Sequence, residues 1–175
     1  MQPKTNTVDC MRYVKWLLVA SVCALVSFVD KDNIGSGYDV GDRVPQFALP
    51  AATDGQPSSL QQLQGGYVLL NFWASYDAPS RTRNVQLHRA LETLPENVKV
   101  RMVSISFDRY RSVFEETVHS DSIGTAACFV DVAGESSPLY KKFRLKRGFR
   151  NYLLDAQGII LAKDVQANEI AAYTK

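Results

Sequence analysis

The sequence predicts one α/β domain built on a mixed β-sheet that helices flank on both faces. Apolar segments typical of strands alternate with segments of helical periodicity, and a short Gly-containing turn joins the last two strand segments. The chain has 175 residues, of which 46% are hydrophobic and 22% charged, so it is long enough to bury a substantial core.

The first strand and helix are the most clearly marked elements. Tyr67–Trp73 is an apolar run that follows Gly65-Gly66 and ends at a turn, which is typical of a strand covered on both faces. Residues 80–94 carry apolar side chains at three- and four-residue spacing, and Pro95 ends that pattern. We therefore expect a central strand followed directly by a helix.

The same alternation continues toward the C-terminus. Four further segments are expected in the order strand, helix, strand, helix, at 98–107, 111–119, 128–131 and 138–143. Two last strands, at 152–155 and 159–162, flank Ala156-Gln157-Gly158, whose Gln-Gly step suits a hairpin.

The N-terminus has the pattern of a targeting segment. The predicted division is a signal peptide or signal anchor at 1–31, a linker at 32–40 and the domain at 41–175. Arg12 and Lys15 precede an apolar run at 16–29, which is shorter than the roughly 20 residues that span a bilayer. The run lacks a clean small-x-small cleavage site, so retention as an uncleaved anchor stays open. We expect an exported domain, periplasmic or membrane-anchored and facing the periplasm or exterior.

Only one of the three cysteines belongs to the predicted domain. Cys10 precedes the apolar run and Cys23 lies inside it, where Val22 occupies the position that a lipoprotein signal reserves for a small residue. A single cysteine cannot close an intramolecular disulfide. Cys128 is expected to be a small buried hydrophobe in its strand, with a reactive lone thiol as the alternative.

The domain is electrically neutral. Of the 20 basic and 18 acidic side chains, four and two lie in residues 1–31, which leaves 16 of each in residues 32–175. A nucleic-acid-binding domain normally carries a basic excess, so we expect no nucleic-acid partner. His88 and His119 have no partner ligands at metal spacing, and we expect neither a metal nor a cofactor.

Five dispersed motifs occur in order between about Val40 and Lys163. They are G-D-R-V-P-Q-F at 41–47, D-G-Q-P-S-S-L at 54–60, W-A-S-Y-D-A-P-S at 73–80, V-S-I-S-F-D at 103–108 and D-A-Q-G at 155–158. Together they resemble the TlpA/ResA group of thioredoxin-like proteins, within the wider AhpC/TSA family. The resemblance implies a thioredoxin-like fold and a thiol-disulfide active site after the first strand.

The resemblance places the two catalytic cysteines of that group on Asp77 and Ser80, and its cis-proline on Phe149. Pro79, between the first two, is retained. A carboxylate cannot usefully attack a disulfide, and a serine hydroxyl needs an activating base. A cis bond before a non-proline residue costs about 3 kcal/mol, so we expect a trans peptide at Phe149. The resemblance therefore implies a degenerate active site that lacks both cysteines.

These residues also have plain structural interpretations. Asp77 stands where a helix should begin, and aspartate is a favoured N-cap. Trp73 and Tyr76 are either packing residues beside the turn or a platform for a ligand. Ser80 and His88 lie two helical turns apart, so they cannot form a catalytic triad with Asp77.

Basic residues gather near the former active-site position. Six cations and no acid occur in ten residues: Lys141, Lys142, Arg144, Lys146, Arg147 and Arg150. Arg81 and Arg83 begin the helix on the opposite side of the site. We hypothesise an electropositive docking surface for an anionic partner, such as an acidic protein segment, a lipid headgroup or a polyanionic ligand. The candidate binding residues are Trp73, Tyr76, Arg81, Arg83, Lys146, Arg147, Phe149 and Arg150.

Two function classes compete. The favoured one is a redox-inactive thioredoxin-like protein of the cell envelope that binds or assembles with a partner at the former active-site groove. The alternative is a thiol-disulfide oxidoreductase or peroxiredoxin-like antioxidant enzyme, acting through Cys128 alone or through the thiols of a partner. A single sequence of this kind is also compatible with a protein that has no selected activity.

Overall fold

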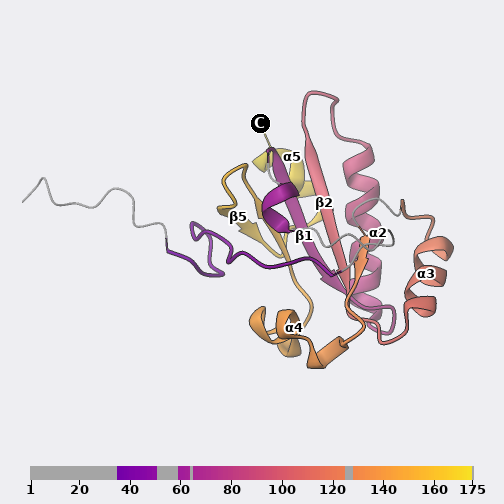
Figure 1. Cartoon of the computed structure of the whole chain (residues 1–175). Coiled ribbons are helices and arrows are strands. Elements are labelled where there is room, and N and C mark those ends of the chain that lie inside the picture. Colours follow the sequence, from indigo (N-terminus) through magenta and orange to yellow (C-terminus); the bar gives the residue numbers. More distant parts are fainter. Residues whose placement is uncertain (1–34, 51–58, 64, 125–127, 175) are drawn as a thin grey trace, which may run out of the picture. The chain divides into compact units, whose positions relative to one another are not determined.

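The computed structural model describes residues 35–50, 59–63, 65–124 and 128–174 (Figure 1). Its helices and strands are, in chain order, η1 (Leu60–Leu63), β1 (Tyr67–Trp73), α2 (Ala78–Glu92), β2 (Val100–Ser106), α3 (Arg111–Ser120), β3 (Cys128–Val130), η2 (Gly134–Ser136), α4 (Pro138–Lys142), η3 (Leu145–Arg147), β4 (Asn151–Leu154), β5 (Ile160–Lys163), η4 (Ala167–Glu169) and α5 (Ile170–Tyr173). Each strand and helix that the sequence predicts is present, with ends that differ by at most two residues.

The strands form one mixed sheet in the order β3-β2-β1-β4-β5. Strands β1, β2 and β3 are parallel, whereas β4 is antiparallel to both β1 and β5. The first strand is central, as expected, because β2 and β4 pair with it on either side. All six residues from Val68 to Trp73 are buried, which explains the nearly unbroken apolar sequence of this strand.

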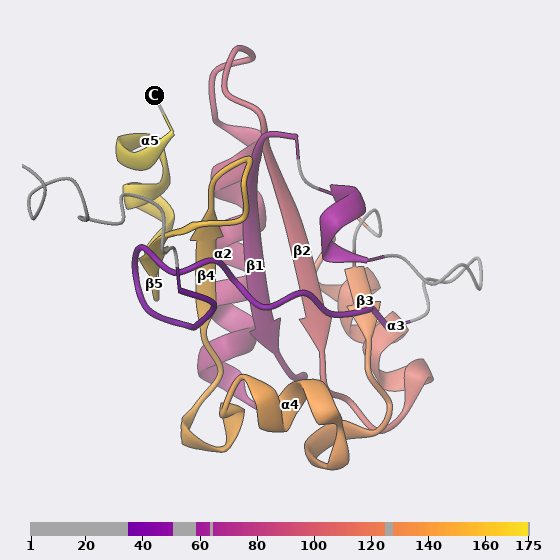
Figure 2. The ribbon, with the colours of Figure 1, turned by 60° about the vertical axis from the view of Figure 1, so that its left-hand side comes forward.

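Helices cover both faces of the sheet, as the sequence predicts (Figure 2). On one face, α2 and α3 pack on clusters around Leu69, Leu153 and Trp73. On the other, α4 and the segment that precedes β1 pack on a cluster centred on Phe72. Side chains alternate between the faces along β1, so successive residues enter different cores.

A buried polar contact fixes α2 on the sheet. The Asn84 side chain, with 0% of its surface exposed, accepts hydrogen bonds from Asn71 of β1 at 2.9 Å and from Ser104 of β2 at 2.8 Å. Leaving such buried donors unpaired costs about 1–3 kcal/mol each. The contact therefore selects one position of α2 along two neighbouring strands.

Residues that precede the predicted start of the domain at residue 41 already contact it. The Tyr38 ring lies 5.1 Å from the Phe143 ring, and Asp39 accepts a hydrogen bond from Lys163 Nζ at 2.9 Å. The described part of the predicted linker, 35–40, is thus in contact with the domain. No helix among the described residues is long and apolar enough to cross a membrane, and the predicted leader at 1–31 lies outside them.

The Phe72 cluster predicts a large penalty for Phe72→Ala. The Phe72 ring is fully buried and lies 4.6 Å from the Phe143 ring and 6.0 Å from the Phe107 ring. Truncation should lower the free energy of unfolding by about 3–5 kcal/mol, measured by urea denaturation. Tyr173→Ala, at a residue that is 43% exposed, is the control and should change it by no more than about 0.5 kcal/mol. A loss below about 1 kcal/mol for Phe72→Ala would contradict this packing.

Candidate functional site

The candidate site lies at the carboxyl ends of β1 and β2. The turn after β1, the loop after β2 and the residues before β4 meet at this edge of the sheet. Ligands of open α/β sheets bind at the carboxyl ends of the strands. Asp77, Ser80 and Phe149 lie at this edge, and each has a defined structural role.

Asp77 and Ser80 close the junction between β1 and α2. Asp77 is the N-cap of α2, and its Oδ2 accepts a hydrogen bond from Ser80 N at 3.0 Å. The Ser80 hydroxyl, 1% exposed, donates to the Asp77 carbonyl at 3.1 Å and accepts from Ala74 N at 3.4 Å. The predicted N-cap is confirmed. In this geometry the Ser80 hydroxyl is enclosed and points back to the turn.

A second carboxylate lies beneath the turn, and sequence reasoning did not single it out. Asp108 follows β2 and is 2% exposed. Its oxygens accept hydrogen bonds from Ser75 N at 3.1 Å, from the Ser75 hydroxyl and from the Ser106 hydroxyl at 2.6 Å. Asp108 ends the V-S-I-S-F-D motif, and its position at the end of a parallel strand was the available signal. It holds the turn after β1 against the loop after β2.

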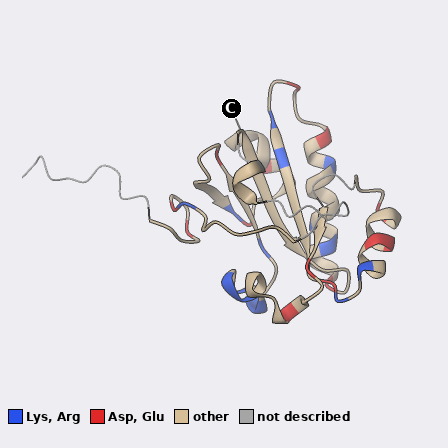
Figure 3. Cartoon of the chain, viewed as in Figure 1, with Lys and Arg blue, Asp and Glu red and all other residues tan. Residues whose placement is uncertain are grey.

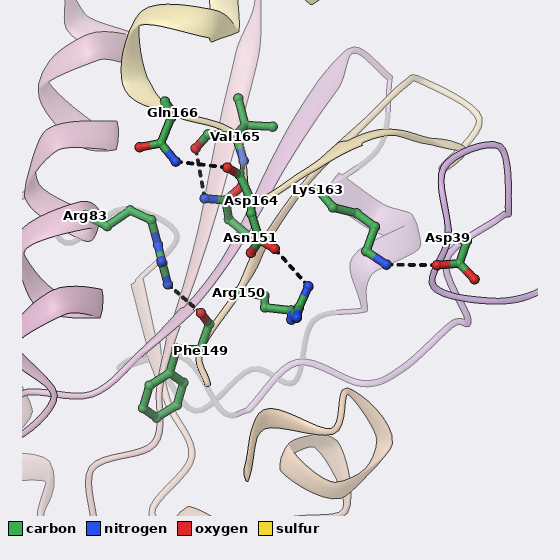
Figure 4. Close-up of polar contacts among 9 residues, drawn as sticks. All are labelled: Asp39, Arg83, Phe149, Arg150, Asn151, Lys163, Asp164, Val165 and Gln166. Carbon is green, nitrogen blue, oxygen red and sulfur yellow. Dashed lines mark hydrogen bonds and ion pairs between the residues drawn. The ribbon is translucent and has the colours of Figure 1, made fainter. Parts of the chain in front are cut away.

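Phe149 is held by a cation from α2. Arg83 Nη2 donates to the Phe149 carbonyl at 2.7 Å, across 66 residues of sequence (Figure 4). Gly148, with a φ of 124°, turns the chain into this position, and the peptide bond at Phe149 is trans, as is every other peptide bond of the described residues. Burial lowers the pKa of the Arg83 guanidinium, and the carboxylates of Asp164 and Asp77 offset part of that effect. Arg83 thus connects α2 to the residues that precede β4.

Four aromatic rings line the site. The Phe149 ring stacks on the Phe107 ring at 6.1 Å and meets the Tyr140 and Tyr76 rings at 6.1 and 6.4 Å. Tyr76 is 62% exposed and Phe149 partly exposed, whereas Phe107 and Tyr140 are buried. Tyr76 and Phe149 therefore present an aromatic surface that rests on two buried rings.

Trp73 does not belong to that surface. It is 0% exposed and packs on Phe114, Val118 and Cys128 beneath α3. Of the two interpretations of Trp73, packing is the one that the structure supports. Its indole Nε1 has no hydrogen-bond partner among the described residues.

The basic residues near the site fall into two groups. Three are engaged within the protein: Arg81 in a bidentate pair with Asp121 at 2.6 and 2.9 Å, Arg150 with Asp164 at 2.8 Å, and Arg83 with the Phe149 carbonyl. The others gather at the end of α4 and in η3 (Figure 3, lower left). Lys146 and Arg147 there are exposed and have no hydrogen-bond or ion-pair partner among the described residues. Of the five basic residues among the candidate binding residues, Lys146 and Arg147 are therefore the two whose charge has no partner among the described residues.

Cys128 lies away from the site, at the first position of β3. It is 7% exposed, and its thiol donates to the Gly124 carbonyl at 3.3 Å. Burial raises the pKa of the thiol to about 11. His88 Nε2 lies 3.9 Å from the sulfur, but burial lowers the pKa of this imidazole and so favours its neutral form. The pair therefore lacks the imidazolium that would stabilise a thiolate.

With this geometry in place, comparison with known proteins identifies the family. The AhpC/TSA family model matches residues 40–163. The chain belongs to the AhpC/TSA family. The five-stranded mixed sheet with helices on both faces is the thioredoxin-like fold.

Several members and solved structures resemble this AhpC/TSA chain. It is 30% identical over 128 residues to the thiol-disulfide oxidoreductase ResA of Oceanobacillus iheyensis, covering 71% of the present chain and 65% of ResA. The crystal structure of a thioredoxin-like protein from Parabacteroides distasonis superposes with a TM-score of 0.66 at 36% identity, covering 79% and 96% of the two chains. A thiol-disulfide oxidoreductase from Bacteroides fragilis gives 0.62 at 30% identity, over 75% and 96%. The chain thus spans less than two thirds of the length of ResA.

No group of three or more His, Cys, Asp or Glu side chains within the described part of this AhpC/TSA chain is arranged to hold a metal ion. His88 and His119, which the sequence left unassigned, lie on α2 and α3. The residues brought together at the site are hydrogen-bonding and aromatic groups.

The N-cap predicts a specific effect of changing Asp77. Asp77→Ala removes the acceptor for Ser80 N and should lower the free energy of unfolding by about 1 kcal/mol, measured by chemical denaturation. Asp77→Asn keeps an accepting side-chain oxygen and is the matched control, with an expected loss of a few tenths of a kcal/mol. Equal losses in the two variants would contradict a capping role.

Proposed function

We propose that this protein is a redox-inactive member of its family, which binds a partner at the edge of the sheet where its relatives carry a dithiol. The observation that carries the proposal is the β1–α2 junction, where Asp77 caps the helix and the Ser80 hydroxyl is enclosed. Neither the Asp77 carboxylate nor the Ser80 hydroxyl supplies a nucleophilic sulfur. A dithiol exchange reaction needs two thiols within bonding distance, and the described residues hold one cysteine.

The buried thiol argues against the alternative enzyme. Thiol-disulfide exchange needs a thiolate that can reach a disulfide. Cys128 is buried, and its pKa of about 11 leaves the thiol protonated at neutral pH. It also lies at the opposite end of its strand from the proposed binding edge. An enzyme that acts through Cys128 alone would therefore lack both a thiolate at neutral pH and access to a disulfide.

The partner is proposed to be a protein or an anionic ligand of the cell envelope. The support for export is the basic and apolar pattern of residues 1–31, and the support for an anionic partner is the exposed pair Lys146 and Arg147. Arg81 and Arg150 are not included in the proposed contact surface, because the carboxylates of Asp121 and Asp164 offset their charge. Tyr76 and Phe149 lie next to it and supply apolar area.

Redox inactivity can be tested in the full chain with Cys10 and Cys23 replaced by serine, so that Cys128 is the only thiol. We expect no acceleration of insulin disulfide reduction above the uncatalysed rate with dithiothreitol. In the same variant, native Cys128 should react with iodoacetamide at pH 7.5 at least about 100-fold more slowly than after unfolding in urea. Disulfide reduction that is abolished by Cys128→Ser would overturn the proposal.

The proposal of an anionic partner predicts that the protein binds an acidic probe. Octaglutamate should bind the full chain in low salt, and Lys146→Gln with Arg147→Gln should weaken it about tenfold, measured by calorimetric titration. Arg89→Gln with Arg101→Gln, at exposed positions on α2 and β2, removes the same two charges and is the matched control, which should leave the affinity within about twofold. Equal weakening by this control pair would show that only the net charge of the protein matters and would contradict a localised surface.

A further inference from the structure

A pocket of about 500 Å³ opens at the same edge of the sheet, beside the Tyr76–Phe149 contact. Its walls come from the turn after β1, the loop after β2, the first turn of α3 and η2. The residues that give it chemical character are Tyr76, Asp108, Arg109, Tyr110, Val113 and Glu135. Neither the turn Leu145–Arg147 nor the buried thiol contributes to it.

Exposed apolar side chains concentrate at this pocket. The described residues include six large apolar side chains that are strongly exposed, and three of them line it. Tyr76 is 62% exposed, Tyr110 70% and Val113 41%. Tyrosine rings offer a polarised face and an apolar body together, and are enriched where proteins bind other proteins. Their gathering around one hollow indicates a binding surface.

Carboxylates outnumber cations in the lining. Asp108 forms the floor and is 2% exposed, while Glu135 lies exposed on η2. Burial raises the pKa of the Tyr76 hydroxyl, and Tyr140, Glu135, Asp108 and Asp77 raise it further, so these groups act on the same ring. With two carboxylates and the one guanidinium of Arg109, the lining has a formal charge of −1, opposite in sign to that of the Lys146 turn.

Arg109 is the one cation of the lining, and its side chain lies against Gly134. A Cβ placed on Gly134 would lie 3.4 Å from Arg109 Cγ, an ordinary van der Waals distance, so the two residues are in close packing contact. Gly134 has a φ of 54°, which also favours glycine. Arg109 thus lies along the η2 wall beside Glu135.

We propose that this pocket receives a lysine or arginine side chain from an extended segment of a partner protein. The aliphatic stem would lie against Val113 and between the Tyr76 and Tyr110 rings, with the cationic end facing Glu135. Long basic side chains combine an apolar stem with a charged head, and a cation over a tyrosine ring is attracted by the ring face. Charge complementarity selects a basic over an acidic or purely apolar residue.

This inference rests on the proposed binding role of the edge and specifies what one part of it recognises. Because the Lys146 turn and the pocket both lie near Phe149, the partner segment would carry an acidic stretch and a basic residue close to each other. Loss of the pocket would leave the insulin assay and the octaglutamate titration unchanged. Failure here is therefore distinguishable from failure of the proposed function.

The test uses the full chain and three blocked heptapeptides that differ only at their centre. The peptide Ac-Ala-Val-Ala-Lys-Ala-Val-Ala-NH2 should bind at least about tenfold more tightly than the versions with norleucine or glutamate at the fourth position, measured by calorimetric titration. Norleucine keeps the stem and removes the charge. Equal binding of the norleucine peptide, tighter binding of the glutamate peptide, or no binding of the lysine peptide would overturn the proposal.

Paired variants test the charge argument in opposite directions. Glu135→Gln and Tyr110→Ala should each weaken the lysine peptide about three- to tenfold, whereas Arg109→Gln should strengthen it by a similar factor. These side chains are at the surface, and near-UV circular dichroism checks that the fold is retained. Arg147→Gln is the control outside the pocket and should change the affinity by less than about twofold. Weakening by Arg109→Gln would overturn the assignment of a cation to this pocket.

Discussion

The arrangement of the site depends on how α2 is fixed against the sheet, and that depends on Asn84. Apolar contacts are non-directional, so they leave a helix more freedom of position against a sheet than hydrogen bonds do. The two hydrogen bonds that Asn84 accepts from Asn71 and Ser104 remove this freedom, since sliding would leave buried polar groups unpaired. Once α2 is fixed, its first turn lies at the end of β1 and Arg83 lies within reach of the Phe149 carbonyl.

The edge that results carries both signs of charge near its aromatic rings. Lys146 and Arg147 are exposed on η3, and Asp108 and Glu135 line the pocket beside Tyr76 together with Arg109. Under the proposed binding role, such a surface would distinguish partner segments by the positions of their charges, because a misplaced segment brings like charges together. A reactive thiol, in contrast, acts on many disulfides.

The sequence predicts the fold well where the signal is local. The apolar run of β1, the periodicity of α2 and the Asp155–Gly158 turn each depend on neighbouring residues, and Asp77 was recognisable as a cap because aspartate stands before a helical pattern. Short elements such as α5 were missed, because four residues form a helix only when tertiary contacts, here the burial of Ile170, support them.

The site was predicted only in part, for a physical reason. A cluster of arginines in the sequence suggests a positive surface, but Arg81 pairs with Asp121, 40 residues away, and Arg150 with Asp164. These ion pairs form only when the chain folds, so the sequence alone does not show which arginines are paired. Burial of Trp73 and the closeness of Asp108 to Ser75 are likewise products of the packed sheet.

The bond from Arg83 to the Phe149 carbonyl bears on the entropy of the proposed association. It connects α2 to the residues before β4 within the protein and so helps to hold this edge of the sheet in one arrangement. A surface that is already arranged loses little conformational entropy when a complex forms. Under the proposed binding role, the site would therefore favour partners that already fit it and would adapt little to others.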